Sequence, residues 1–238
     1  MSKHRKMQIQ LNQLLTINPI GENQQKVFDA WAKEKNLFLS GSAGTGKTFI
    51  LLHLAFKAVL DKGEPYDKVI LVRSLLPSRD IGFLPGTLEE KSDLYQDPYR
   101  ILTKYLFEQP SEQAHEQLYG KLVGQGSLEF YSTSFLRGQT FDRSIIIVDE
   151  ASNLTFQELD TIMTRVGQDS KIMFAGDMAQ SDLRKNNGDQ DGYHNFQMIL
   201  EEMDEFEVIE FSIGDIIRSG LVRSYLIAKS NMQLKEVL

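Results

Sequence analysis

The stretch GSAGTGKT, residues 41–48, decides the fold of this chain. It fits the pattern G-x-x-x-x-G-K-[ST], in which glycines let backbone N–H groups turn inward around phosphates. An apolar run, LFLS (37–40), precedes it, and a helical pattern, FILLHLAFKAVLDKG (49–63), follows it. A strand before the loop and a helix after it are the context that phosphate binding requires, because the helix N-terminus also attracts an anion. A glycine-rich turn without a ligand is the alternative, and it does not explain that context.

The loop therefore predicts a site for a nucleoside triphosphate. Lys47 is expected to reach the β- and γ-phosphates and to serve catalysis, and Thr48 is expected to offer its hydroxyl to Mg²⁺. The residues expected to surround the nucleotide are Gly41, Ser42, Ala43, Gly44, Thr45, Gly46, Lys47, Thr48 and Phe49.

Composition narrows the class of protein. The chain has 238 residues, 41% hydrophobic and 25% charged, with a net charge of −7 and no cysteine. It can bury a core, but it has neither disulfides nor thiolate metal ligands, and it lacks the basic coat typical of nucleic-acid binders. No apolar run approaches the roughly 20 residues that span a bilayer, and the basic N-terminus has no apolar segment after it. We expect a cytoplasmic protein without a membrane partner.

Short apolar runs alternate with helical patterns along the chain. The predicted strands are 37–40, 68–73, 128–133, 144–150, 171–177 and 206–211. The run Ile145–Val148 is apolar throughout, which indicates a parallel sheet covered on both faces. We predict an α/β, RecA-like P-loop NTPase fold, with a mainly parallel sheet between helices.

Further segments complete the predicted organisation. A helix over 155–168 starts at Thr155 with Glu158 three residues on, a capping box. Residues 74–127 are interpreted as a mainly helical insertion with a turn at GFLPG (82–86). Residues 1–20 form either an ordered arm or a tail, and residues 21–238 one domain.

Two adjacent carboxylates end the predicted strand at 144–150. Asp149 is expected to hold the hydration shell of Mg²⁺, and Glu150 to orient and deprotonate an attacking water. A polar strand terminus without a role is the alternative, which the upstream phosphate loop disfavours. The glutamate favours a hydrolase over a kinase, because a kinase excludes water.

The stretch AGDMAQSDL (175–183) ends the next strand. Gln180 is placed to sense the γ-phosphate and the water, because an amide both donates and accepts. Asp177 is expected to support the strand end. An ordinary turn built on Gly176 and Asp177 is the alternative.

Four further stretches follow one another in order: GENQQKVF (21–28), RDIGFLPGTLEEKSDLYQDPYRIL (79–102), FLRGQTFDRSIIIVDEASNLT (135–155) and DIIRSGLVRSYL (215–226). With the phosphate loop they resemble superfamily 1 helicases and, more closely, PhoH-like proteins, over roughly residues 20–228. The compact length is similar to that of bacteriophage PhoH-like proteins. One departure is Ser74, where cellular relatives carry proline, which puts the local turn in doubt.

The resemblance implies further site residues. Gln24, with Gln25 as its neighbour, would read the adenine edge and favour ATP, although a polar residue at a helix start is the alternative. Arg218 would act as an arginine finger on the γ-phosphate, and Arg223 is a second candidate. A solvated helix face is the alternative for both arginines.

The resemblance also implies partners. A superfamily 1 helicase carries two such domains, so a single domain is expected to share its ATP site with a neighbouring copy in a ring, with a hexamer favoured. The insertion at 79–105 would meet single-stranded RNA or another nucleic acid. Its stacking candidates are Phe83, Tyr95, Tyr99 and Phe107, beside Arg79, Lys91, Arg100 and Lys104; core aromatics and surface charges are the alternative.

The residues thus predict a Mg²⁺-dependent ATPase, and the resemblance to PhoH-like proteins implies that it acts on single-stranded RNA. Two other classes stay open. A nucleotide-switched assembly protein would bind host factors and turn over slowly. A small-molecule kinase would use the same phosphate loop but would gain nothing from Glu150 and Gln180.

Overall fold

The computed structural model describes residues 9–74, 88–133, 136, 138–177, 189–217 and 220–236. Its centre is a sheet of six parallel strands in the order β3-β2-β4-β5-β1-β6. The strands are β1 (Asn36–Gly41), β2 (Lys68–Arg73), β3 (Leu128–Ser132), β4 (Ser144–Val148), β5 (Lys171–Ala175) and β6 (Phe206–Phe211). The predicted α/β fold with a parallel sheet is confirmed.

The central strands are buried on both faces, as their continuous apolar runs predict. All five residues of β4 and all five of β5 are buried. Side chains alternate along β4: Ile145 and Ile147 join one hydrophobic cluster, and Ile146 and Val148 join the other. This alternation follows from the two-residue period of a strand, so one strand anchors two cores.

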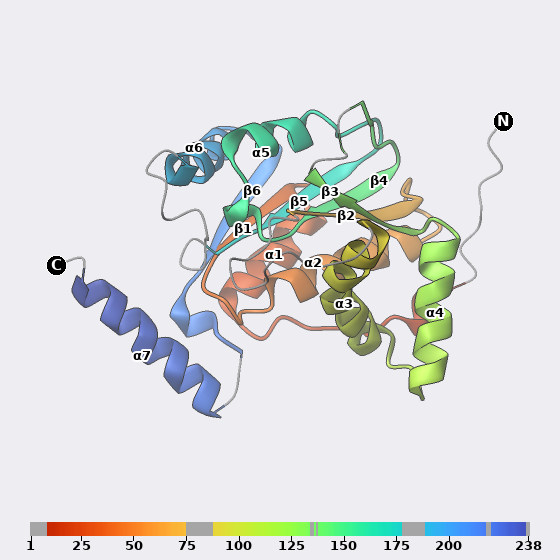
Figure 1. The fold of residues 1–238 in the computed structure, drawn as a ribbon, viewed down its shortest axis with the longest axis horizontal. Helices are drawn as coiled ribbons and strands as arrows, with labels where there is room; N and C mark the ends of the chain where they lie inside the picture. The colour runs from red at the N-terminus through yellow and green to blue at the C-terminus, as the bar shows by residue number, and fades with distance from the viewer. Residues whose placement is uncertain are drawn as a thin grey trace.

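Helices cover both faces of the sheet (Figure 1). On one face lie α1 (Glu22–Ala32), α2 (Lys47–Leu60), α3 (Leu88–Phe107) and α4 (Glu112–Gly124). On the other lie α5 (Phe156–Met163) and α6 (Asp189–Glu201). The last helix, α7 (Gly220–Glu236), projects from the body, and its Leu221 is 85% exposed.

Helix α5 is shorter than the predicted helix over 155–168. It begins with the expected capping box between Thr155 and Glu158 but ends at Met163. Beyond that point the chain pairs with another segment, since the Phe141 N–H donates to the Arg165 carbonyl and Phe141 forms a bridge with Val166. Tertiary pairing therefore overrides the local helical pattern.

The insertion is helical over its described part, as predicted, and consists of α3 and α4. Two of its aromatic residues were candidates for stacking on bases, and that prediction is wrong for both. Tyr99 is 1% exposed and Phe107 is 2% exposed, because both pack into the core. Phe83, Tyr95, Arg79 and Lys91 lie outside the residues whose side chains are described.

The segment before α1 lies against the domain from residue 9 onward. Ile9 and Leu14 are buried, and the Leu15 N–H donates to the Leu106 carbonyl at 2.7 Å. The His53 ring contacts the Leu15 carbonyl at 3.0 Å. Within the described part of the chain, every helix is too short or too polar to cross a bilayer.

Candidate nucleotide-binding site

A cavity of about 710 Å³ opens at the carboxyl edge of the sheet. In parallel sheets this edge is where ligands bind, because the loops that follow the strands meet there. The cavity is lined by Ala43, Gly44, Thr45, Gly46, Lys47, Thr48, Phe49, Leu102, Asp149, Glu150, Ser152, Asn153, Ala175, Gly176, Asp177 and Ile217. Seven of these residues come from the phosphate loop and the start of α2.

The glycines of the phosphate loop are required by its path. Gly46, the residue before α2, has φ 85°, a conformation that L side chains rarely adopt. Gly41 has φ 104°, and a Cβ there would lie 2.0 Å from the Phe211 carbonyl oxygen. The Ser42 N–H donates to that same carbonyl at 2.9 Å. Strand β6 therefore braces the loop from behind, which leaves no room for a side chain at position 41.

Lys47 occupies the middle of the loop. Its Nζ donates to the Gly41 carbonyl at 2.9 Å and to the Ser42 carbonyl at 2.8 Å. Burial lowers the pKa of Lys47, and the negative charges of Asp177 and Asp149 oppose that shift. A buried ammonium is costly unless an anion lies close to it, and here the carboxylates are distant. A phosphate bound in the loop would provide that anion.

Asp149 connects the loop to the end of β4. Its Oδ1 accepts from the Thr48 hydroxyl at 2.9 Å, and its Oδ2 accepts from the Tyr99 hydroxyl at 3.0 Å. Burial raises the pKa of Asp149, and the two hydroxyl donors partly offset this. Hydroxyl and carboxylate oxygens are the donors that Mg²⁺ prefers, and Mg²⁺ keeps several waters besides one or two such protein groups. The donor set at Thr48 and Asp149 therefore fits a magnesium ion.

Glu150 lies in the same cavity but is held by other side chains. Its backbone is left-handed, with φ 52° and ψ 39°, which is strained for a residue with a Cβ. Its carboxylate forms an ion pair with Arg73 at the end of β2. Its second oxygen lies 3.5 Å from the Asn153 amide nitrogen.

The end of β5 forms the remaining wall. Gly176 packs so closely that a Cβ would lie 2.5 Å from the Tyr193 hydroxyl. The Asp177 N–H donates to the Ser152 hydroxyl at 3.2 Å, which ties the end of β5 to the segment after β4. Gln180, the predicted sensor of the γ-phosphate, lies outside the described residues.

Gln24 touches the phosphate loop, but its amide is already bonded within the chain. Its Nε2 donates to the Thr45 carbonyl at 3.2 Å, and its Oε1 accepts from the Ile20 N–H at 2.9 Å. Contact with adenine requires these bonds to be exchanged. Gln25 is exposed and donates to Asp29 at 2.8 Å. Neither glutamine lines the cavity.

The chain returns to the phosphate loop after β6. The Ile217 N–H donates to the Gly44 carbonyl at 3.1 Å, and the Ile217 side chain lines the cavity. Arg218, the predicted arginine finger, is the next residue and lies outside the described residues. Arg223 is exposed on α7 and does not line the cavity of its own chain.

The sequence did not predict the roles of two side chains at the site. Arg73 was one residue of a predicted strand, and Tyr99 was a stacking candidate. The signal for Arg73 was present, because residues at the ends of neighbouring parallel strands meet at one edge. Nothing in the sequence places the Tyr99 hydroxyl on Asp149, since the contact depends on how α3 crosses the sheet.

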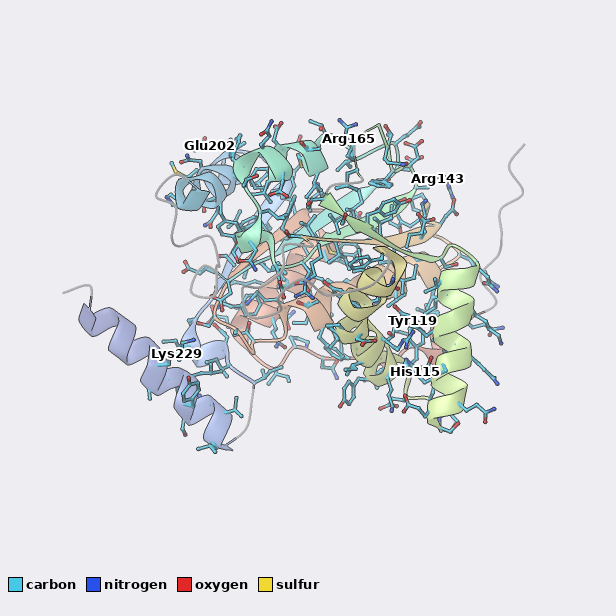
Figure 2. The ribbon with its side chains drawn as sticks, viewed as in Figure 1. His115, Tyr119, Arg143, Arg165, Glu202 and Lys229 are labelled. Carbon is cyan, nitrogen blue, oxygen red and sulfur yellow. The ribbon has the colours of Figure 1, made fainter. Side chains whose placement is uncertain are left out.

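A second group of potential metal ligands lies on α4. One ligand atom from each of Glu112, His115 and Glu116 lies within 4.8 Å of the other two. The side chains of α4 are visible in Figure 2, where His115 is labelled. However, Glu112 pairs with Lys104 and Glu116 with Arg100 of α3. Because both carboxylates already have cationic partners, this group is better explained as a contact between two helices.

Comparison with known proteins identifies relatives over most of the chain. The family model described as PhoH-like protein matches residues 16–229. A PhoH-like protein of Mycobacterium leprae (strain TN) is 34% identical over 208 residues, which are 87% of this chain and 56% of that protein. Protein PhoH of Escherichia coli (strain K12) is 31% identical over 213 residues, 88% of this chain and 57% of that protein. The chain thus spans a little over half the length of these curated relatives.

Solved structures with a similar arrangement are more distant. The Hef helicase domain of Pyrococcus furiosus aligns with a TM-score of 0.44 at 12% identity, covering 82% of this chain and 39% of that one. Pif1 from Bacteroides sp, in complex with ADP-AlF4, aligns with a TM-score of 0.37 at 18% identity, covering 86% of this chain and 44% of that one. Likeness at this level says nothing about activity.

Proposed function

The chain belongs to the PhoH-like protein family, and we propose that it is an ATPase that uses Mg²⁺. One observation carries the proposal: Lys47, Thr48, Asp149 and Glu150 line a single cavity. Phosphate binding, metal binding and water activation therefore have their candidate side chains within one site.

The proposed binding step follows from the phosphate loop. The triphosphate oxygens take the place of the carbonyl oxygens around Lys47 Nζ. They also accept hydrogen bonds from the backbone N–H groups of residues 43–48. The positive end of α2 points at the same phosphates. Thr48 and Asp149 would hold a magnesium ion, which would neutralise charge on the phosphates.

The proposed chemistry belongs to Glu150 and Gln180. Glu150 accepts a proton from the attacking water, and Gln180 orients that water against the γ-phosphate. Selection of ATP is assigned to Gln24 or Gln25. Gln24 is the better placed because it contacts the phosphate loop through Thr45.

We further propose a ring of copies, with a hexamer favoured, in which Arg218 acts on the ATP of a neighbour. The helix that follows supports an intermolecular contact, since Leu221 is 85% exposed and Tyr225 is 62% exposed. Action within the same chain is the competing arrangement, because Ile217, the preceding residue, contacts Gly44 of its own chain. Mixing Arg218→Ala with Lys47→Ala subunits distinguishes the two: activity regained on mixing requires an arginine from a neighbour.

Single-stranded RNA is the proposed track, by analogy with helicase-type proteins. Among the described side chains of α3, Tyr105 is 64% exposed and Ile101 is 54% exposed. Tyr105 replaces the buried Tyr99 and Phe107 as the stacking candidate, and Ile101 adds apolar surface beside it. The acidic net charge of −7 predicts a modest affinity that falls with salt. One domain over residues 21–238 and a location in the cytoplasm stay predictions.

ATP hydrolysis by the purified protein tests the proposal, measured with single-stranded RNA, with single-stranded DNA and with neither. Glu150→Gln is the control, because it keeps the side-chain shape and removes the base. Stimulation by a nucleic acid that is lost in Glu150→Gln supports a nucleic-acid-coupled ATPase. Hydrolysis that neither polymer alters favours the nucleotide-switched assembly protein. ATP binding without hydrolysis favours the kinase and contradicts the ATPase.

A further inference from the structure

Two ion pairs connect strands β2 and β4, one at each edge of the sheet. At the carboxyl edge, Arg73 ends β2 and pairs with Glu150, two residues after β4. At the amino edge, Asp67 precedes β2 and pairs with Arg143, which precedes β4. The strands are adjacent and parallel, with Val72 opposite Val148, so both pairs follow from the register. Only the pair at the carboxyl edge involves a residue of the cavity.

Arg73 is enclosed, which makes its contact with Glu150 specific. Its side chain is 18% exposed, against 45% for that of Glu150. Tyr99 and Asp149 lie within electrostatic reach of the guanidinium. A charged group in such a place is held by its partners, and water screens the pair less than it would on an open surface.

The contact restricts what Glu150 can do in this conformation. Its Oε1 is occupied by the guanidinium, and its Oε2 faces Asn153 at 3.5 Å. A general base must present a free oxygen to the water that it deprotonates. Here the carboxylate is turned towards β2 and its charge is balanced by the cation.

We propose that Arg73 is a positioning residue that withholds Glu150 from the attacking water until the ion pair opens. The proposal rests on the proposed ATPase function. In the resting protein the pair keeps hydrolysis slow, and a ligand that stimulates turnover does so in part by releasing Glu150. Arg73 does not line the cavity, so we expect its effect on nucleotide affinity to be small.

Arg73→Gln tests this, because glutamine keeps a hydrogen-bond donor but removes the charge. Basal kcat is expected to rise about fivefold, the effect of losing an ion pair worth about 1 kcal/mol. The KM for ATP should stay unchanged, and the stimulation by nucleic acid should fall by a similar factor. Arg73→Lys, which restores the charge on a different geometry, should return kcat towards the wild-type value.

Arg143→Gln is the matched control, because it removes an arginine–carboxylate pair between the same two strands. Figure 2 labels Arg143 at the edge of the sheet. Arg143 does not line the cavity, so its substitution leaves the cavity unchanged. Its kcat and KM should equal those of the wild type. Binding of a fluorescent ATP analogue and circular dichroism confirm that each variant is folded.

The outcomes separate this proposal from the proposed function. Hydrolysis that depends on Glu150 in the wild type, and that is unchanged or slower in folded Arg73→Gln, overturns the restraint and leaves the ATPase standing. If Arg73→Gln does not fold, Arg73→Met takes its place, because it also removes the charge, and a kcat of folded Arg73→Met at or below that of the wild type overturns the restraint instead. Hydrolysis that appears only in Arg73→Gln, and disappears in Arg73→Gln/Glu150→Gln, supports the restraint. No hydrolysis in any variant overturns both.

Discussion

Replacing Tyr99 by phenylalanine isolates one hydroxyl at the centre of the site. The Tyr99 side chain is 1% exposed, and its hydroxyl donates to Asp149 Oδ2 at 3.0 Å. Burial raises the pKa of Tyr99 far above its usual value, so the hydroxyl keeps its proton as a donor. Phenylalanine preserves the ring and its packing against Phe130, whose ring centre is 6.1 Å away. The substitution therefore removes a hydrogen bond without creating a cavity.

The expected loss follows from the partner's charge. A hydrogen bond to an ionised group contributes about 1.5–3 kcal/mol, and the Tyr99 side chain that donates it is enclosed in the core. We expect the free energy of unfolding in urea to fall by that amount in buffer with a chelator. With Mg²⁺ and a non-hydrolysable ATP analogue the deficit should shrink, because the carboxylate then has another cationic partner.

Tyr119→Phe is the matched control in the neighbouring helix. Tyr119 is 4% exposed, and its hydroxyl contacts the neutral Gln96 Oε1 at 3.4 Å. The expected loss there is below about 1 kcal/mol. If Tyr99→Phe is as stable as the wild type in both buffers, the Tyr99 hydroxyl does not stabilise the Asp149 carboxylate.

Four other predictions concern two glycines, the Asp149 carboxylate and the last helix. Gly41→Ala, with φ 104° and a carbonyl 2.0 Å from the new Cβ, should lose at least about 3 kcal/mol of unfolding free energy. Gly120→Ala within α4, where nothing lies within 4 Å, should gain about 0.5–1 kcal/mol in the same urea titration. Burial raises the pKa of Asp149, so its stabilising contribution is complete below the unfolded pKa of about 4 and is lost as pH rises through the folded pKa. Asp149→Asn should therefore unfold at a higher urea concentration than the wild type at neutral pH without Mg²⁺, and equal stability would contradict this. Leu221→Ser with Tyr225→Ser should reduce oligomer size in mass photometry and leave circular dichroism unchanged, whereas an unaltered assembly would exclude α7 from the interface.

Periodicity and local chemistry were sufficient to predict the sheet. Continuous apolar runs such as Ile145–Val148 are found in strands buried on two faces, and the capping box at Thr155 and Glu158 is a local pattern that forms as expected. The phosphate loop was also predictable, because local backbone conformation within a few residues requires its glycines.

Contacts between distant segments were not predictable in the same way. Tyr99 lies 50 residues from Asp149, and Arg73 lies 77 residues from Glu150. An aromatic residue in a charged helix is compatible with core packing or with a nucleic-acid surface, and only the crossing of α3 over the sheet decides between them. The contact of Gln24 was not predictable from the sequence either, because its amide bonds to the Thr45 carbonyl instead of facing open space.

The phosphate loop is braced by segments near both ends of the chain. Gln24 contacts Thr45 from the N-terminal side, and Ile217 contacts Gly44 just before α7. If a neighbouring copy binds α7, the change in the position of Ile217 alters the backbone that receives the phosphates. Coupling between two binding events is reciprocal, so a copy that changes the affinity for ATP must have its own affinity changed by ATP to the same factor. Assembly measured with and without nucleotide therefore reports on the same coupling as ATP binding measured at low and high protein concentration. Ile217→Ala should bring both factors towards one, and factors unchanged in the folded variant would show that Ile217 does not carry the coupling.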